Sequence, residues 1–431
     1  MFKMNSVLSE LEAKNKPIIT AVCGIGKMGK SLVNQMLQLK GMHAGIIINR
    51  NVNKAKRVLT ELKVSETDIV KTDNIKIAKE SIEKGKFVIS DDYTLPSRVS
   101  LVDAVVDATG NPVYGAKLSY ESLKNSKNMI MLNVECDSTV GSYLNKLAKE
   151  NGVIYTGADG DEPAAIIGLI EFAKSIGLEV LAAGKGKNNK IDRYATNEEL
   201  AQEAKEKKLC EKSLTSFVDA TNTMIELNAV SNATGFLPDV FGCHGIHANT
   251  DELIEKLRLK TEGGILNSYK TLDYVYGIAP GVYALVSTDS NETKEDMKYL
   301  GMGDGPNYLL YRPFHLCSLE VPRTIFSAVI EKQATINPIM GQISDTIAVA
   351  KRDIKAGEKI KGIGNDDCYG MLHEAKTALE KDYLPIGLID EAAIANCDIK
   401  KDKIITRSMI DIDSKEIIYE MRSQIDKDLM R

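Results

Sequence analysis

The chain has 431 residues, of which 43% are hydrophobic and 27% charged, and 55 basic residues stand against 60 acidic ones. This composition is typical of a globular protein with two or three domains, and it excludes disordered, collagen-like and disulfide-stapled classes. The net charge of −5 leaves no basic surplus for binding nucleic acid.

The cysteines, the apolar stretches and the first sixteen residues predict a soluble cytoplasmic protein. The 7 cysteines form no CxxC pair, which favours a reducing compartment over disulfides or structural zinc. The most apolar window, 164–183, contains three charged residues and is not expected to cross a membrane. Residues 1–16 lack the apolar stretch of a secretory signal, and they contain acids, which mitochondrial signals avoid.

Strands alternate with helices along the first part of the chain. Apolar runs predict strands at 18–23, 44–48, 87–90, 104–108 and 129–134, and amphipathic patterns predict helices at 27–39 and 52–62. Such alternation is typical of a doubly wound parallel sheet, so residues 1–158 are predicted to form an α/β Rossmann domain.

A glycine-rich loop follows the first predicted strand and opens the first helix of this domain. It has the pattern GxGxxG and comprises Gly24, Ile25, Gly26, Lys27, Met28 and Gly29. In dinucleotide-binding folds these glycines allow the tight turn, the approach of a pyrophosphate, and close packing of helix on strand. The alternative is a purely structural turn.

The end of the second predicted strand bears on the choice of cofactor. NAD-binding folds place an Asp or Glu there to bind the ribose 2′-hydroxyl. This chain instead has Asn49 and Arg50, with Lys54 one turn later. Because a guanidinium suits a 2′-phosphate, NADP(H) is predicted over NAD(H), the alternative being that Arg50 is merely solvated.

Polar residues also stand at the ends of two later strands. Thr109 and Gly110 follow the strand at 104–108, and Asn133 and Glu135 end the next one. Ligands of such sheets lie at the carboxyl edge, so these residues are expected to border the nicotinamide pocket. Capping of loops by the same polar groups is the alternative.

The chain changes character after the Rossmann segment. Helices are predicted at 163–175, 196–208 and 214–233, the second with a capping box formed by Thr196 and Glu199. A strand at 179–183 leads into the segment 184–189, whose glycines and asparagines predict a loop. Short strand-like pieces dominate the last ninety residues or so, which gives predicted domains at 159–340, catalytic and oligomeric, and 341–431, small and β-rich.

With these segments in view, the chain resembles the homoserine-dehydrogenase-like oxidoreductases with a C-terminal SAF domain, a group that includes the DXR-like reductoisomerases. The resemblance spans nearly the whole chain and is carried by 24–29, 107–112, 132–135, 160–163, 185–189, 192–196, 217–219, 238–244, 302–306 and 311–315. It implies an NADP(H)-dependent oxidoreductase with a β-clip tail. Some members are understood to convert 1-deoxy-D-xylulose 5-phosphate to 2-C-methyl-D-erythritol 4-phosphate with NADPH, a step of isoprenoid biosynthesis.

Two lysines are the leading catalytic candidates. Carbonyl reduction needs a proton donor or a cation at the developing alkoxide, and Lys185 and Lys187 follow a predicted strand in the glycine-asparagine segment. One ammonium would serve the oxyanion and the other an anionic substrate group. Asp192 is expected to pair with a lysine and set its pKa, and the alternative for all three is a solvated loop.

A second acidic candidate lies on the helix predicted at 214–233. Asp219, Asn222 and Glu226 have the spacing i, i+3, i+7 and would share one helix face. Homoserine-dehydrogenase-type sites likewise direct carboxylates of a second domain at the nicotinamide, so Asp219 is predicted to be catalytic. An exposed polar face is the alternative.

Further residues are candidates for binding a metal ion or the substrate. Asp159, Asp161 and Glu162 would bind Mg²⁺ or Mn²⁺ if isomerisation precedes reduction, although Glu162 also suits the start of a helix. The candidates for substrate contacts are Asn188, His244, Arg312 and His315.

The sequence therefore predicts an NADP(H)-dependent oxidoreductase acting on a small hydroxylated carbonyl compound, possibly a sugar phosphate. The alternatives are a simple hydroxy-acid, sugar-acid or homoserine-type dehydrogenase and, more remotely, an NADP(H) sensor without turnover. No nucleic acid or membrane partner is expected. A homo-oligomer, dimer or tetramer, is implied by the resemblance.

Overall fold

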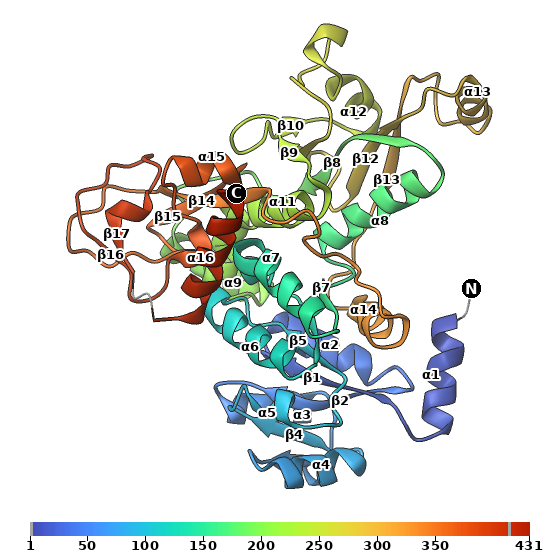
Figure 1. The fold of residues 1–431 in the computed structure, drawn as a ribbon, viewed down its shortest axis with the longest axis vertical. Helices are drawn as coiled ribbons and strands as arrows, with labels where there is room; N and C mark the ends of the chain where they lie inside the picture. Colours follow the sequence, from blue (N-terminus) through green and yellow to red (C-terminus); the bar gives the residue numbers. More distant parts are fainter. Residues whose placement is uncertain (1–2, 413–414) are drawn as a thin grey trace. The chain divides into compact units, whose positions relative to one another are not determined.

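The computed structural model describes residues 3–412 and 415–431. The chain forms two compact units, each assembled from separate stretches (Figure 1). Unit 1 comprises 1–161, 316–337 and 416–424, and unit 2 comprises 162–315, 338–415 and 425–431. Among the described residues, no helix has the length and apolar character needed to span a membrane.

Unit 1 contains a seven-stranded parallel sheet in the order β3-β4-β2-β1-β5-β6-β7. Its strands are β1 (Ile18–Cys23), β2 (Met42–Ile48), β3 (Ile69–Lys71), β4 (Phe87–Ser90), β5 (Ala104–Asp107), β6 (Asn128–Met131) and β7 (Tyr155–Gly157). All residues of β1, β4, β5 and β6 are buried, as expected of strands covered on both faces. The predicted α/β fold with a doubly wound parallel sheet is confirmed.

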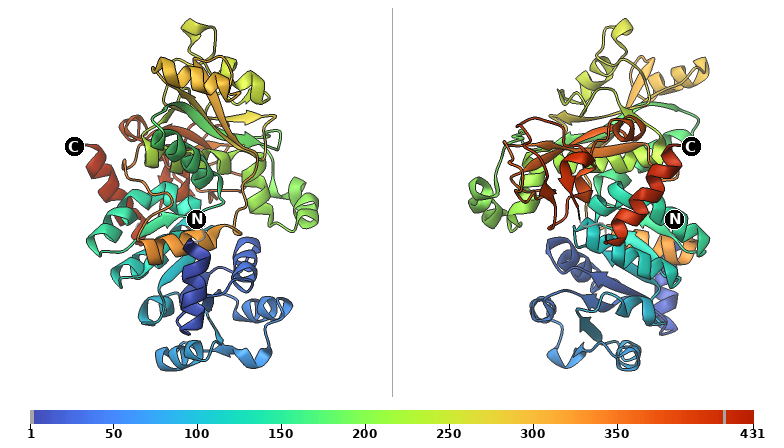
Figure 2. Two further views of the ribbon diagram at one scale, coloured as in Figure 1. Left: turned by 90° about the vertical axis from the view of Figure 1, so that its right-hand side faces the viewer. Right: turned by 60° about the vertical axis from the view of Figure 1, so that its left-hand side comes forward.

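Helices lie on both faces of this sheet (Figure 2). The helices of this unit are α1 (Lys3–Ala13), α2 (Lys27–Met36), α3 (Val52–Glu61), α4 (Ile75–Glu83), α5 (Leu95–Arg98), α6 (Pro112–Lys124), α7 (Val134–Glu150) and α14 (Val321–Phe326), together with the first part of α16 (Ile417–Leu429). Two elements of this unit end earlier than predicted. The helix expected at 27–39 ends at Met36. The strand expected at 129–134 ends at Met131, because Asn133 caps α7 by accepting from the backbone N–H of Cys136.

Unit 2 is built on a mixed sheet in the order β10-β11-β8-β12-β13, with β9 paired to β11. The strands are β8 (Glu179–Lys187), β9 (Leu237–Pro238), β10 (Ile246–His247), β11 (Thr271–Tyr276), β12 (Val282–Ser287) and β13 (Asn307–Arg312). The helices of this part are α8 (Glu162–Ser175), α9 (Asn197–Lys207), α10 (Glu211–Val218), α11 (Thr221–Thr234), α12 (Thr250–Lys256) and α13 (Asn291–Tyr299). Helices α8 and α11 pack on one face of the sheet through a buried apolar cluster.

Strand β8 corrects the predicted loop at 184–189. The strand continues through Gly184–Lys187 and pairs there with β11 and β12. A Cβ on Gly184 would lie 1.8 Å from the carbonyl oxygen of Asp273, and one on Gly186 would lie 2.5 Å from Cα of Ala279. The glycines therefore serve close packing of backbones rather than a turn.

The long helix predicted at 214–233 is two helices. Helix α10 ends at Val218 and α11 begins at Thr221, with Ala220 between them at a φ of 69°. The carboxylate of Asp219 accepts from the backbone N–H of Thr221 at 2.8 Å, an Asx turn that stabilises the break. The predicted capping box of Thr196 and Glu199 at the start of α9 is confirmed.

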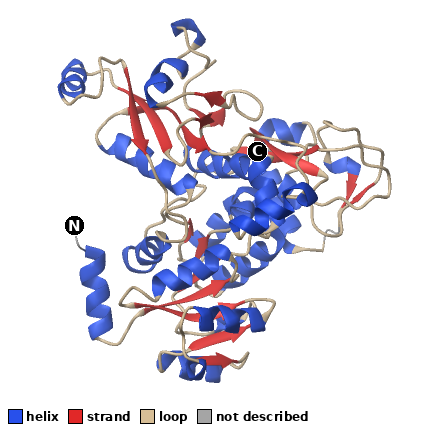
Figure 3. Cartoon of the chain, turned by 180° about the vertical axis from the view of Figure 1, so that it is seen from behind, coloured by secondary structure: helices blue, strands red, loops and turns tan. Residues whose placement is uncertain are grey.

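The C-terminal part of unit 2 has little regular structure (Figure 3). It contains the antiparallel pair β14 (Ser344–Ala350) and β15 (Cys368–Glu374), the short pair β16 (Ile394–Ala395) and β17 (Ile410–Asp411), and α15 (Ala375–Glu380). Buried hydrogen bonds join the β14–β15 hairpin to α11. They link Gly370 to Thr221, Ser344 to Ser231, and the backbone of Ser344 to Asn232.

Candidate functional site

The glycine loop has the geometry that a dinucleotide pyrophosphate requires. Gly24 has a φ of 93°, and a Cβ there would lie 2.6 Å from the carbonyl oxygen of Ala108. A Cβ on Gly29 would lie 1.9 Å from the carbonyl oxygen of Gly24. Gly26 differs, since a Cβ there would meet no atom within 4 Å, so the start of α2 is open to a ligand.

The other loop residues flank this opening. Ile25 is buried in the core of unit 1, whereas Lys27 is exposed and Met28 half-buried at the start of α2. The backbone N–H of Ile25 donates to the side chain of Asn49 at 3.4 Å. Asn49 thus ties the glycine loop to the end of β2. The next residue, Arg50, is exposed, and no ion pair involving it occurs in the described part of the chain.

Asp107, at the end of β5, organises the neighbouring loop. Its carboxylate accepts from the backbone N–H of Thr109 at 2.9 Å, from its hydroxyl at 2.6 Å, and from the amide of Asn133 at 2.8 Å. Burial raises the pKa of Asp107 although these hydrogen bonds lower it. Asn133 is completely buried in this network, so its amide positions the loop rather than presenting itself to a ligand.

Glu135 and Gly110 lie beside this network. Burial and the charge of Asp107 raise the pKa of Glu135 to about 7, although a hydrogen bond to its own backbone N–H lowers it. Gly110 has a φ of 63°, and a Cβ there would have Oε1 of Glu135 as its nearest neighbour, at 3.9 Å. A titratable carboxyl group therefore stands at the carboxyl edge of the sheet, where the sequence placed it.

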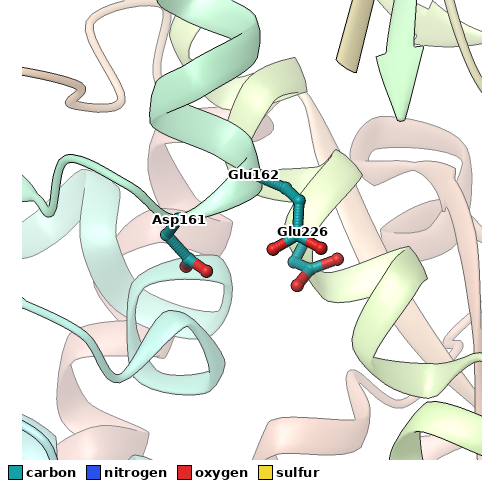
Figure 4. A group of neighbouring side chains, drawn as sticks. All are labelled: Asp161, Glu162 and Glu226. Carbon is teal, nitrogen blue, oxygen red and sulfur yellow. The ribbon is translucent and has the colours of Figure 1, made fainter. Parts of the chain in front are cut away.

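A buried charge cluster in unit 2 centres on Lys185. Its ammonium lies 2.7 Å from Oε1 of Glu162, at the start of α8, and also pairs with Oε2 of Glu226 on α11. The side chains of Lys185 and Glu226 are 6% and 5% exposed. Asn222, one turn before Glu226, donates to Oε1 of Glu226 at 2.7 Å. Figure 4 shows the carboxylates of Glu162 and Glu226 directed toward each other.

The pKa values in this cluster are strongly shifted. Burial alone would lower the pKa of Lys185, but the charges of Glu162 and Glu226 outweigh burial and raise it. Burial would likewise raise the pKa of Glu162, yet the charges of Lys185 and His315 lower it to about 2. At neutral pH the cluster is therefore a charged lysine held between two carboxylates.

Lys187 has a different environment, although it is only two residues away on the same strand. Its ammonium donates to the backbone carbonyl of Phe217 at 2.7 Å, and no carboxylate pairs with it in the described part of the chain. Burial, reinforced by the charge of Lys185, lowers its pKa to about 8, although Glu226, Asp219 and Glu162 raise it. This lysine can release a proton near neutral pH, whereas Lys185 cannot.

His315 and Arg312 approach the same face of the sheet. Nε2 of His315 lies 3.4 Å from Oε1 of Glu162. Arg312 pairs in register with Val282, which pairs with Lys185, so Arg312 and Lys185 lie in one cross-strand row and point to the same face. Its guanidinium lies over the ring of Phe314, 4.8 Å from the centroid.

Asp219 and Asp192 have contacts that the sequence did not predict. Asp219 ends α10 and does not share a helix face with Glu226. Its carboxylate is completely buried and lies 2.7 Å from the ammonium of Lys351. Burial nevertheless raises the pKa of Asp219, against the effect of Lys351. Asp192 is exposed, and its carboxylate accepts from the backbone N–H of Tyr194 rather than pairing with a lysine.

Two predicted substrate contacts lie farther along the sheet. Asn188 is exposed directly after β8. Nε2 of His244 lies 2.7 Å from Oδ2 of Asp239, and the backbone N–H of His244 donates to Asp273 at 3.0 Å. His244 is therefore held in a hydrogen-bonded turn next to β11.

Two of the three predicted metal ligands, Asp161 and Glu162, have carboxylate oxygens within 4.8 Å of each other, and Asp159 does not belong to this group. The backbone N–H of Asp159 donates to Thr324 at 2.7 Å, and Asp161 accepts from the thiol of Cys317 at 3.7 Å. Asp161 adjoins Glu162 through the chain and is drawn beside it in Figure 4. The carboxylate that the structure brings to Glu162 from elsewhere in unit 2 is Glu226, not Asp159.

Sequence comparison places an enzyme family on this part of the chain. Residues 160–321 match the family model described as oxidoreductase DRL, catalytic domain. The chain thus carries an oxidoreductase catalytic domain, which confirms the predicted enzyme class. None of the curated proteins matches the chain.

The comparison with solved structures found several oxidoreductases. One, from Bacillus cereus, is 12% identical over 74% of this chain and 91% of that chain, with a TM-score of 0.38. The 1-deoxy-D-xylulose 5-phosphate reductoisomerase of Zymomonas mobilis, solved with NADPH, is 16% identical over 50% and 57%, with a TM-score of 0.34. An Agrobacterium radiobacter oxidoreductase, solved with NAD+, L-tartaric acid and magnesium, is 11% identical over 40% and 44%, with a TM-score of 0.29.

Proposed function

We propose that this protein is an NADP(H)-dependent oxidoreductase that reduces a small, hydroxylated and phosphorylated carbonyl compound, in the manner of 1-deoxy-D-xylulose 5-phosphate reductoisomerase. The observation that carries the proposal is the buried cluster of Lys185, Glu162 and Glu226 with Lys187 beside it on β8. All four residues lie in the segment that matches an oxidoreductase catalytic domain.

The residues of unit 1 fit a dinucleotide. The open start of α2 at Gly26 would receive the pyrophosphate, and the bound nicotinamide would supply the hydride. Preference for NADP(H) is supported by the exposed Arg50 and by Asn49, which stands where an NAD-binding fold has a carboxylate. An exposed arginine with no ion pair to a described residue is suited to bind a 2′-phosphate.

The two lysines would have different roles in carbonyl reduction. Lys187 would donate the proton to the developing alkoxide, since its pKa of about 8 matches that task. Lys185 would remain charged and stabilise the negative charge that develops on the substrate oxygen. Glu226, oriented by Asn222, and Glu162 would hold the Lys185 ammonium in place.

A divalent cation would compete with Lys185 for the same carboxylates. Glu162 and Glu226 are oxygen donors of the kind Mg²⁺ binds, but Lys185 already neutralises both. A metal ion at Glu162 would have to displace that ammonium. We therefore derive no step of the reaction from a metal.

The C-terminal hairpins support the proposed SAF-like tail of a homoserine-dehydrogenase-like chain, and the predicted domains 1–158, 159–340 and 341–431 follow the same resemblance. Assembly of two or four copies through the central segment is part of this proposal. Size-exclusion chromatography with light scattering would measure the number of subunits.

The test is NADPH oxidation, followed at 340 nm, with 1-deoxy-D-xylulose 5-phosphate and a panel of ketose phosphates, keto acids and sugar acids. We expect turnover with a phosphorylated ketose, and a lower KM for NADPH than for NADH. Turnover of unphosphorylated keto acids alone, which are reduced to hydroxy acids, would indicate the simple dehydrogenase instead. Tight NADPH binding without turnover of any substrate would indicate the sensor.

A further inference from the structure

Arg193 is a half-buried cation, and among residues 3–412 and 415–431 it has no acidic partner. Its guanidinium lies over the ring of Tyr369 on β15, 5.1 Å from the centroid, and contacts the sulfur of Met371. In the described part of the chain, no carboxylate forms an ion pair with it. Withdrawing a cation from water without a counter-charge is unfavourable, so a site with this composition favours an anionic ligand.

The chain holds Arg193 close to Lys187. The ammonium of Lys187 donates to the carbonyl of Phe217, and the backbone N–H of Asp192 donates to the next carbonyl, that of Val218, at 3.0 Å. Both ends of the segment 187–193 are therefore fixed to the same end of α10. The charge of Arg193 also acts on Tyr276, which pairs in register with Lys187.

We propose that Arg193 binds the anionic group of the substrate while the carbonyl lies at Lys187. This inference rests on the proposed function and adds to it the residue that selects for the anion. The anion is a phosphate monoester or a carboxylate, since a guanidinium can bind either with two parallel hydrogen bonds. Tyr369 and Met371, from the C-terminal hairpin, would hold the guanidinium in place.

The matched control is Arg352→Met. Arg352 lies just after β14, and it already forms ion pairs with Glu358 and Asp367 at 2.7 and 2.8 Å. Arg193→Met and Arg352→Met thus remove the same charge from the same unit, but only the first removes a cation without an acidic partner. Arg193→Lys keeps the charge and loses the forked geometry.

The first measurement is the KM of the phosphorylated substrate. Arg193→Met should raise it about 10- to 100-fold, as expected for a lost hydrogen bond to a charged group, with kcat and the KM for NADPH within about threefold of the wild type. The KM of the same ketose without its phosphate should not change. Arg193→Lys should restore part of the loss, and Arg352→Met should have no such effect. Equal losses for both ketoses would overturn the proposal.

The second measurement does not depend on turnover. With the dinucleotide loop filled by NADPH, inorganic phosphate and glycolate are compared as probes for their ability to raise the melting temperature. We expect one of them to stabilise the wild type and Arg352→Met but not Arg193→Met, and the effective probe identifies the anion. Stabilisation that survives in Arg193→Met, or none in the wild type, refutes the role of Arg193. A positive result without turnover of any sugar phosphate would refute the proposed function alone.

Discussion

Two lysines on one strand acquire opposite properties from their neighbours. Lys185 has two carboxylates and a raised pKa, whereas Lys187 has a backbone carbonyl, a charged lysine nearby and a pKa of about 8. Their side chains share a face of β8 because residues i and i+2 of a strand do so. The difference lies in which helix each side chain meets, α8 and α11 for Lys185 and the end of α10 for Lys187.

Lys187→Met should reduce reductive kcat about 10²- to 10⁴-fold, the range typical of a lost general acid. Because the protonated amine is the active form, wild-type activity should fall as the pH rises through about 8, the pKa of Lys187. The measurement is a pH–rate profile of NADPH oxidation. The exposed Lys190 of the same segment supplies the control, since Lys190→Met should leave the profile unchanged. A profile without a limb near pH 8 would contradict the assignment.

Lys185→Met should increase the affinity for divalent cations. The substitution removes the ammonium that pairs with both Glu162 and Glu226, and hard cations bind oxygen donors of this kind. Titration with Mn²⁺, followed by electron paramagnetic resonance, should detect at least tenfold tighter binding than in the wild type or in Lys190→Met. Unchanged Mn²⁺ binding in a folded Lys185→Met protein would show that the carboxylates do not form a cation site.

At the scale of single elements, the packing of β8 against its neighbouring strands depends on glycines. From the sequence pattern alone, these glycines predict a loop. Gly184→Ala should destabilise the protein by about 1–3 kcal/mol or more, because the new Cβ would lie 1.8 Å from the carbonyl oxygen of Asp273. Gly168→Ala is the contrasting control, since Gly168 is an exposed residue of α8 with open space around it. Alanine there should stabilise by about 0.5–1 kcal/mol. Urea denaturation of both variants measures these changes.

The same strand explains what could be predicted and what could not. The five predicted strands of the Rossmann segment are apolar runs of hydrophobic residues, and their burial follows from composition. The extension of β8 through Gly184–Lys187 depends on the backbones of β11 and β12, which lie almost a hundred residues away along the chain. The sequence around residues 184–187 does not show which distant strands pair with this segment. The break at Ala220 had one local signal, since Asp219 followed two residues later by Thr221 is typical of an Asx turn.

The candidate site was predictable to a similar extent. The lysines and the glycine loop stand out because their residue types are unusual for their positions. The pairing of Lys185 with Glu162 and Glu226 joins three elements, β8, α8 and α11, and only the fold brings them together. Arg193 was not predicted as a site residue, because its lack of an acidic partner is a property of the folded chain.

At the scale of the molecule, a buried ion pair fastens the C-terminal segment to the helices that carry the site. Lys351, just after β14, pairs with Asp219 between α10 and α11, and it also donates to the carbonyl of Asn365 at 2.8 Å. Lys351→Met should cost about 3–5 kcal/mol of unfolding free energy, because Asp219 would remain buried without its partner. Asp219→Asn combined with Lys351→Met should recover part of that loss.

The control for this prediction is Lys359→Met, which removes the same charge from an exposed position. Thermal or urea unfolding of the three variants and the wild type measures the difference. A Lys351→Met protein as stable as Lys359→Met would show that the buried pair contributes nothing to the attachment of the C-terminal segment.

Each unit is assembled from stretches that are separated along the chain, and this affects the order in which the parts of unit 1 are synthesised. Gly157, in the last strand of the large sheet, pairs with Ile336, and the stretch 416–424 also belongs to unit 1. During synthesis the stretches 316–337 and 416–424 of unit 1 therefore leave the ribosome after residues 162–315, which belong to unit 2. Until Ile336 has been synthesised, the outer edge of β7 lacks its partner at Gly157, and an unpaired strand edge is a place where another chain can pair.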